Sequence, residues 1–220
     1  MQIVLYPGAL IPDLKNLRIL ALVPKELGKE YKDINLIIAH LGSGISIGLH
    51  KKGKIVDVNN AIAGEDPFSP ERSGGIPAGT YLKYVFDNKL NFQDALKMLY
   101  GQGGMYAYLG TNDFQKVMKD YDEGKKEEVK LVIDAMAYKI SKEIASLAAP
   151  VAGEVDGIVI TGGLAYSKTF ISIIRSSIGF ITSNIFIYPG EDELQAMADG
   201  VVLGLRGEIK IHEYSSEKNL

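Results

Sequence analysis

A glycine-containing turn between two apolar segments narrows the range of folds open to this chain more than any other stretch. The sequence NLIIAHLGSGISIG occupies residues 35–48. Residues 36–39 are a short apolar run of the kind that forms a buried strand, and residues 45–48 alternate as a second strand does. The Gly-Ser-Gly turn at residues 42–44 predicts a hairpin. Such a turn either only reverses the chain or also exposes backbone N–H groups to a phosphate.

The composition is that of an ordinary globular protein and excludes several classes of function. Of the 220 residues, 46% are hydrophobic and 23% are charged, as in typical soluble domains. The net charge of −3 gives no reason to expect nucleic acid or an anionic membrane as a partner. The absence of cysteine excludes disulfides and thiolate catalysis. The sequence starts without a basic secretory region, and no apolar run approaches the ~18 residues of a membrane helix, so we expect a cytoplasmic protein.

Three strands and a long loop are predicted for the first third of the chain. In the lead segment, residues 1–33, the run 19–23 is compatible with a short strand, and Pro24 marks the first turn of a following helix. Residues 54–58 resume the alternation after a Lys-Lys-Gly turn, and so extend the hairpin to an antiparallel meander. Residues 59–79 are rich in Pro and Gly, and a loop of this length in a compact domain is usually functional or disordered.

The rest of the chain predicts alternating helices and strands. The clearest helix spans 125–149, where apolar residues recur at spacings of three and four until Pro150. The other predicted helices are about 80–88, 92–99, 113–121, 166–177 and 191–206, and the other predicted strands are 156–161 and 184–188, before a polar tail at 208–220. Three antiparallel strands and then a βαβα series give an α/β domain at 34–207, with a five-stranded mixed sheet and a helical insertion at about 61–124.

Five motifs follow one another on these elements. They are HLGSGIS (40–46), SPERSGGIPAG (69–79), YLGTND (108–113), ITGGLAYS (160–167) and YPGEDELQAMADG (188–200). The element order resembles the ribonuclease H-like domain of acetate and sugar kinases, heat-shock chaperone ATPases and actin. The motifs resemble the second phosphate loop, arginine loop, adenosine-side acidic loop, adenosine motif and closing helix of the acetate kinase family. The similarity is to the C-terminal domain of the butyrate kinase branch and covers about residues 35–207.

The resemblance implies an acyl kinase that transfers the γ-phosphoryl group of Mg-ATP to a short-chain carboxylate, giving an acyl phosphate and ADP. A carboxylate is already ionised at pH 7, so the reaction needs positive charge rather than a general base. Arg72 lies in a Gly/Pro loop, and its planar guanidinium suits phosphoryl or carboxylate oxygens. The alternative for Arg72 is a loop ion pair with Glu71 or Asp66. His40 is predicted to donate to a phosphoryl oxygen, although a lone histidine is more often structural.

The nucleotide is expected between two glycine turns. The predicted cofactor-binding residues lie at turns, at a strand end or at a helix start, and they are Gly42, Ser43, Gly44, Asp113, Thr161, Gly162 and Gly163. For Asp113, a contact with the ribose or adenine competes with simple capping of its helix. Glu193 is predicted either to hold Mg²⁺ through water or only to favour its helix N-terminus. His50 and His212 have no such context and are interpreted as surface residues.

The short lead segment departs from the family pattern. Family kinases have two similar domains with ATP and the acyl substrate between them, and residues 1–33 do not match the N-terminal domain. The resemblance also implies dimerisation through this domain, so we expect a homo-oligomer, with a separate N-terminal domain as a further partner. A nucleotide-binding or oligomerisation half-domain without turnover is the main alternative. Another ATPase of the same superfold, such as a sugar kinase, is disfavoured by the ERSGG and GEDE segments.

Overall fold

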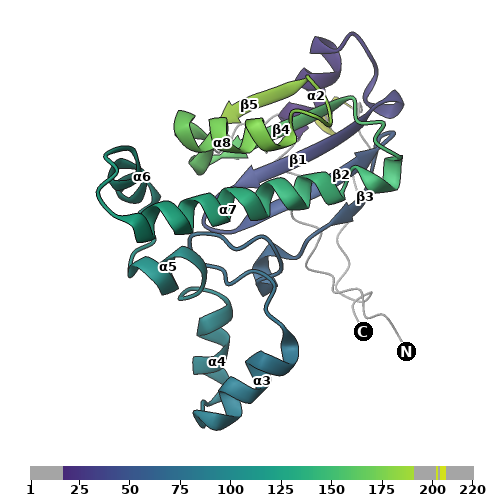
Figure 1. The fold of residues 1–220 in the computed structure, drawn as a ribbon. Coiled ribbons are helices and arrows are strands. Elements are labelled where there is room, and N and C mark those ends of the chain that lie inside the picture. The colour runs from purple at the N-terminus through teal and green to yellow at the C-terminus, as the bar shows by residue number, and fades with distance from the viewer. Residues whose placement is uncertain (1–16, 191–201, 203, 207–220) are drawn as a thin grey trace, which may run out of the picture.

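The computed structural model describes residues 17–190, 202 and 204–206, and at its centre is a five-stranded mixed sheet (Figure 1). The strands lie in the order β3-β2-β1-β4-β5. The first three form an antiparallel meander, while β4 is parallel to β1 and β5 is parallel to β4. Their bounds are β1 Asn35–Leu41, β2 Ile45–Lys51, β3 Lys54–Val58, β4 Gly157–Gly162 and β5 Ile185–Pro189. The predicted α/β class and mixed sheet are confirmed.

Helices cover the sheet and fill the insertion between β3 and α7. Helices α7 (Glu127–Ser146) and α8 (Lys168–Ile178) pack on one face, and α2 (Leu17–Glu26) packs on the other. The insertion is helical, as predicted, and α3 and α4 extend away from the sheet (Figure 1). Its helices are α3 Ala78–Asp87, α4 Phe92–Leu99, α5 Gly104–Leu109 and α6 Phe114–Asp122. The short 3₁₀ helices among the described residues are η2 Tyr31–Asp33, η3 Ala61–Ala63, η4 Ala149–Val151 and η5 Gly163–Tyr166.

Some predictions fall on residues that the structure does not describe. The predicted closing helix at 191–206 lies outside the described residues except at 202 and 204–206, and Glu193, His212 and the tail lie outside them entirely. Within the described part of the chain, no helix combines the length and the apolar character that crossing a bilayer requires.

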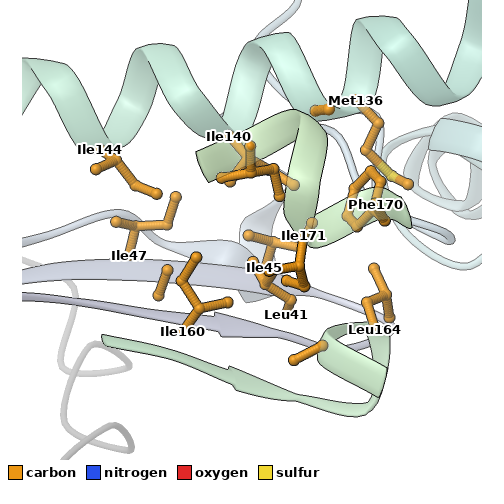
Figure 2. Packing of buried hydrophobic residues seen from close by; sticks show 14 of the residues in the cluster. Leu41, Ile45, Ile47, Met136, Ile140, Ile144, Ile160, Leu164, Phe170 and Ile171 are labelled. Atoms are coloured by element: carbon orange, nitrogen blue, oxygen red, sulfur yellow. The ribbon is translucent and has the colours of Figure 1, made fainter. Parts of the chain in front are cut away.

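The main core lies between the sheet and α7 with α8. A continuous stripe of α7 is buried, at Val129, Ile133, Met136, Ile140 and Ile144. Figure 2 shows Met136, Ile140 and Ile144 of this stripe facing the strands, where Ile45 and Ile47 of β2 and Ile160 of β4 belong to the same core. Burying each such side chain contributes about 1.5–3 kcal/mol relative to leaving it in water. The apolar spacing of 125–149 therefore sets how α7 lies across the strands.

The opposite face of the sheet carries a smaller core. Its buried members are Val23, Ile34, Leu36, Ile38 and Val159. Val23 comes from α2, so the run 19–23 is helical and the predicted short strand is wrong. Pro24 lies inside this helix rather than at the start of a new one. A short apolar run does not by itself distinguish a strand from a buried helical turn. Here the run forms a helix that packs against the sheet through Val23.

His50 was expected at the surface, and this expectation is wrong. Its side chain is 1% exposed, and Nδ1 lies 2.8 Å from the hydroxyl oxygen of Tyr31. His50 pairs with Leu36 in the β1–β2 register, so both face the side of the sheet that α2 and η2 cover. Burial lowers the pKa of His50 to about 4, because the charged imidazolium loses solvation. The surface interpretation rested on the lack of a site motif around His50, and the sequence did not show that segments distant along the chain bury this position.

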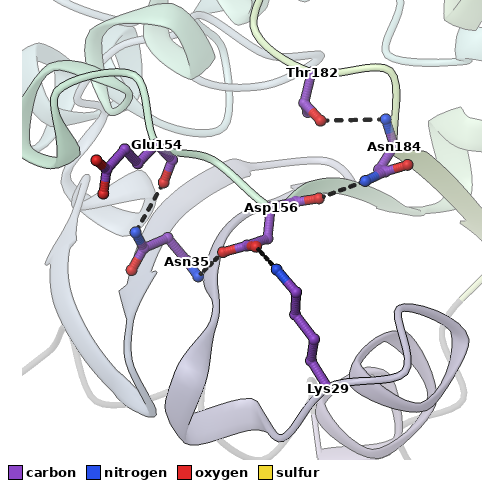
Figure 3. Close-up of polar contacts among 6 residues, drawn as sticks. All are labelled: Lys29, Asn35, Glu154, Asp156, Thr182 and Asn184. Carbon is purple, nitrogen blue, oxygen red and sulfur yellow. Dashed lines mark hydrogen bonds and ion pairs between the residues drawn. The ribbon is translucent and has the colours of Figure 1, made fainter.

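The amino-terminal ends of the parallel strands are tied together by polar side chains (Figure 3). The carboxylate of Asp156, just before β4, accepts from the backbone N–H of Asn35 at 2.8 Å and pairs with Lys29 Nζ at 2.6 Å. Asn184, just before β5, donates to the Asp156 carbonyl at 2.9 Å. Partial burial alone would raise the pKa of Asp156, but the hydrogen bonds from Lys29 and Asn35 outweigh it, and the pKa is lowered. This network joins β1 to β4 through the ionised carboxylate, and β4 to β5 through the Asp156 backbone carbonyl.

Candidate functional site at the carboxyl ends of the parallel strands

The carboxyl ends of β1, β4 and β5 meet at one edge of the sheet, and glycine lies at each end. Residues 42–44 follow β1, Gly162 ends β4, and Gly190 follows β5. The N–H of Gly162 donates to the Gly190 carbonyl at 3.2 Å, and the reverse bond measures 3.0 Å. Gly162 has a φ of +92°, and a Cβ there would overlap the Leu41 backbone, so the position requires glycine. Ligands of open α/β sheets bind outside the carboxyl ends of the strands, which makes this edge the candidate site.

The glycine turn after β1 has open backbone donors. The N–H of Gly42 donates to the Gly44 carbonyl at 3.1 Å, which closes the turn. Among the described residues, none accepts a hydrogen bond from the N–H of Ser43 or Gly44. Consecutive free N–H groups in a turn form a concavity that suits an anion. The turn therefore has the donors that the phosphate-binding interpretation requires.

Arg72 lies against this turn. A Cβ placed on Gly44 would be 3.9 Å from Cγ of Arg72. The side chain is 22% exposed, its Nη1 is 3.4 Å from Glu71 Oε2, and its buried Nε has no hydrogen-bond partner in the described structure. Asp66, the other ion-pair candidate, instead pairs with Lys139 Nζ at 2.7 Å. A single long contact with Glu71 leaves guanidinium donors of Arg72 available for a ligand.

The loop that contains Arg72 is held by several hydrogen bonds that the sequence did not reveal. The Asn59 side chain accepts from Ile47 N–H at 2.6 Å and donates to the Ile45 carbonyl at 2.9 Å and the Asp66 carbonyl at 2.8 Å. The Asp66 carboxylate accepts from Gly75 N–H at 2.9 Å. An Asn at the end of a strand is a typical turn-forming residue, and this is the sequence signal that could have indicated Asn59.

His40 and Thr161 are register neighbours on β1 and β4 at this edge. His40 is half-buried and lies two residues before the glycine turn, where the sequence placed it. The hydroxyl of Thr161 is buried and donates to the Gly190 carbonyl at 3.3 Å. Thr161 thus holds the residue that follows β5 against the end of β4. The roles of both residues toward a phosphoryl group stay predictions.

The turn after β4 leaves Gly163 open. Gly163 is exposed, and a Cβ added there would meet nothing within 4 Å. The chain continues through η5 before α8 begins, and Ser167 caps α8 by accepting from Phe170 N–H at 3.2 Å. The predicted direct turn from strand into helix therefore contains an extra 3₁₀ turn. Gly163 lies where a ligand can approach the backbone, and its nucleotide contact stays a prediction.

The acidic loop at 108–113 reaches the arginine loop. Asn112 Nδ2 donates to Glu71 Oε1 at 2.5 Å. The Asp113 carboxylate accepts from Lys116 N–H at 3.0 Å and so caps α6. Capping was one of the two interpretations of Asp113, and the ribose contact stays a prediction. Glu71 joins two of the motifs, a role that no local pattern in the sequence indicated.

The described residues do not fit a metal site held by the protein. No group of three or more His, Asp or Glu side chains among them is arranged to hold an ion. Glu193, the predicted Mg²⁺ ligand, lies outside the described residues.

Comparison with known proteins places this geometry in a family. A model of the acetokinase family matches residues 19–177. Acetate kinase from Porphyromonas gingivalis superposes with a TM-score of 0.76 at 20% identity, over 86% of this chain and 54% of that chain. A propionate kinase from Francisella tularensis gives 0.73 at 21% identity, over 83% and 52%. Acetate kinase from Entamoeba histolytica gives 0.72 at 16% identity, over 85% and 56%.

At these identities the structures establish a shared fold, including the five-stranded mixed sheet and its helices. The chain spans about half the length of each of these three kinases, since it covers 52% to 56% of them.

Proposed function

The chain belongs to the acetokinase family, and from this premise we propose that it is a carboxylate kinase of the butyrate type, represented here by its C-terminal domain. It transfers the γ-phosphoryl group of ATP to a short-chain carboxylate, giving an acyl phosphate and ADP. The assignment to the butyrate type rests on the resemblance of the five motifs between residues 40 and 200, taken together and in order. A cytoplasmic location goes with this metabolic role. The observation that carries the proposal is Arg72 lying against the Gly42–Gly44 turn, whose Ser43 and Gly44 N–H groups are open.

The chemistry follows from charge. A substrate carboxylate oxygen forms a bond to the γ-phosphorus, the bond from that phosphorus to the bridging oxygen breaks, and ADP leaves with the electron pair. No proton has to move, because the carboxylate is already ionised at pH 7. Arg72 and the Gly44 N–H stabilise charge on the phosphoryl oxygens in the transition state, and His40 adds a further donor.

Nucleotide binding completes the proposal. The phosphates of ATP lie against the 42–44 turn, and the adenosine lies toward Gly162 and Gly163, with Asp113 on the ribose side. Mg²⁺ arrives with the ATP phosphates, as is usual for this ion, and Glu193 is its proposed contact through water.

Self-association is proposed for the same domain. The α3–α4 pair exposes large apolar side chains, and the clearest are Leu82, Tyr84, Phe86 and Phe92. Apolar side chains gathered in this way mark interaction surfaces. We expect light scattering to report a species larger than the 24.0 kDa monomer at micromolar concentration. A monomer under these conditions would contradict self-association.

The test of function is a hydroxamate assay for acyl phosphate, with Mg-ATP and butyrate as substrates. The full chain is assayed alone and together with an N-terminal domain from a butyrate kinase. We expect turnover in the mixture. We expect little turnover from the chain alone, because the N-terminal domain forms the other side of the cleft in which the substrates are proposed to bind. A second candidate function is a nucleotide-binding half-domain without turnover, which is favoured by the coverage of only about half of each related kinase. ATP binding without acyl phosphate formation in the mixture would select that candidate.

A further inference from the structure

Ser69 lies at the start of the arginine loop, is 0% exposed, and has all of its polar groups bonded. Its hydroxyl donates to the Ser43 carbonyl at 2.6 Å and accepts from Arg72 N–H at 3.1 Å. Its N–H donates to the Arg72 carbonyl at 3.1 Å, and its carbonyl accepts from Met105 N–H at 3.0 Å. One buried hydroxyl thus joins the glycine turn to the residue that carries the predicted catalytic charge.

The bond to Ser43 affects the ligand side of the glycine turn. The Ser43 carbonyl also accepts from Glu71 N–H at 3.3 Å, so two donors of the arginine loop hold it. In a trans peptide the carbonyl and the following N–H point in opposite directions. Fixing the Ser43 carbonyl toward the loop therefore directs the Gly44 N–H away from the loop backbone, and none of the described residues accepts from it.

The other bonds of Ser69 fix the Arg72 backbone. Two hydrogen bonds join residues 69 and 72 across a tight turn. Gly104 packs beneath this turn so closely that a Cβ would overlap the carbonyl oxygens of Ser69 and Arg72. The Arg72 backbone therefore has little freedom to move relative to Ser43.

We propose that Ser69 is a positioning residue for phosphate binding, which sets the relation between the Gly44 N–H and the Arg72 guanidinium so that both contact one phosphoryl group. This rests on the proposed function. Ser69 itself is buried and does not touch the nucleotide. Its removal weakens contacts with phosphates and leaves contacts with adenosine unchanged, which loss of packing alone does not do.

The experiment is titration calorimetry of the full chain with ATP and, separately, with adenosine. Ser69→Ala is expected to weaken ATP binding about fivefold to tenfold, the size of one lost hydrogen bond, with adenosine affinity unchanged. Ser69→Thr keeps the hydroxyl and is expected to restore most of the ATP affinity. Ser141→Ala is the matched control, because Ser141 is 6% exposed and its hydroxyl bonds only the Ala137 carbonyl within α7.

Equal ATP affinities for wild type and Ser69→Ala would overturn the role of Ser69. Wild type that binds neither ATP nor adenosine would instead overturn the proposed function. If Ser69→Ala does not unfold cooperatively, the same titrations are made with Ser69→Cys. Cysteine is close in size to serine, and its thiol is only a weak donor. Weakened ATP binding by the Cys variant supports the proposal, and wild-type affinity contradicts it.

Discussion

The two ends of the parallel strands differ in how their polar groups are used. At the amino-terminal end, Asp156 binds Lys29 and the Asn35 N–H, and Asn184 binds the Asp156 carbonyl, so the strand starts are joined (Figure 3). At the carboxyl-terminal end, the Gly44 N–H and the Nε of Arg72 have no partner among the described residues.

The comparison distinguishes an end of the sheet where polar groups are paired from the end proposed to bind the ligand. At the amino-terminal end, which we call the closed end, the polar side chains are paired with one another. At the carboxyl-terminal end, which we call the open end, a glycine turn and a loop arginine have hydrogen-bond donors without partners among the described residues. Buried or clustered donors without partners are costly in a folded protein, and a ligand that accepts them recovers that cost. Changes at the closed end should therefore alter stability, and changes at the open end should alter binding and turnover.

The largest expected effect is at the open end. In the chain supplied with an N-terminal domain, Arg72→Ala should lower acyl phosphate turnover by about 10² to 10³, as for other preorganised donors to a transition state. Arg72→Lys should recover little, because one ammonium group does not reproduce a two-pronged contact. The hydroxamate assay measures both variants. Lys83→Ala is the control, since Lys83 is exposed on α3, which extends away from the sheet. Turnover near wild type for Arg72→Ala would contradict a catalytic role and leave Arg72 as a loop ion pair.

The next effect concerns the closed end and its response to acid. The pKa of His50 is lowered from 6.5 to about 4 by burial, so the unfolded chain binds this proton first as pH falls. The contribution of His50 to stability is complete above pH 6.5 and is lost as the pH falls toward 4, by about 3 kcal/mol in total. Urea unfolding of wild type and His50→Gln across this range measures the difference. The variant keeps an acceptor for Tyr31 without titrating, and an equal pH dependence in both proteins would contradict the assignment.

A smaller effect is expected at Asp156. Asp156→Ala leaves the Asn35 N–H without its acceptor, which should cost about 1–3 kcal/mol in the free energy of unfolding. Asp156→Asn keeps an acceptor and loses only a partly exposed ion pair, so it should cost less than about 1 kcal/mol. Because the pKa of Asp156 is lowered from 3.8, its contribution is present above that pH and is lost as pH falls through the lowered value. Urea unfolding at pH 7 measures both variants. An unchanged unfolding free energy for Asp156→Ala would contradict a stabilising role for the Asp156 network.

The order of elements could be predicted from the sequence because local patterns determine it. The apolar spacing of α7 and the glycines of the first hairpin are visible without any long-range information. The burial of His50 was not, because it depends on α2 and η2 lying over β2. The pairing of Asp66 with Lys139 and the bond from Ser69 to Ser43 join positions far apart in the sequence. The residues predicted for the site were mainly those in motifs, while those that hold them in place were missed.

The central claim is that the open end binds the phosphates of ATP. Its most direct test is titration calorimetry of the full chain with Mg-ATP, comparing wild type with Gly163→Asp and Gly79→Asp. A Cβ at either glycine meets nothing within 4 Å, so each variant adds one carboxylate without steric overlap, at the proposed site or on α3. The account predicts measurable ATP binding by wild type and Gly79→Asp, and at least tenfold weaker binding by Gly163→Asp, because the added carboxylate lies at the proposed nucleotide site and repels the polyanionic nucleotide. Equal heats for all three proteins, or no heat with wild type, would contradict it.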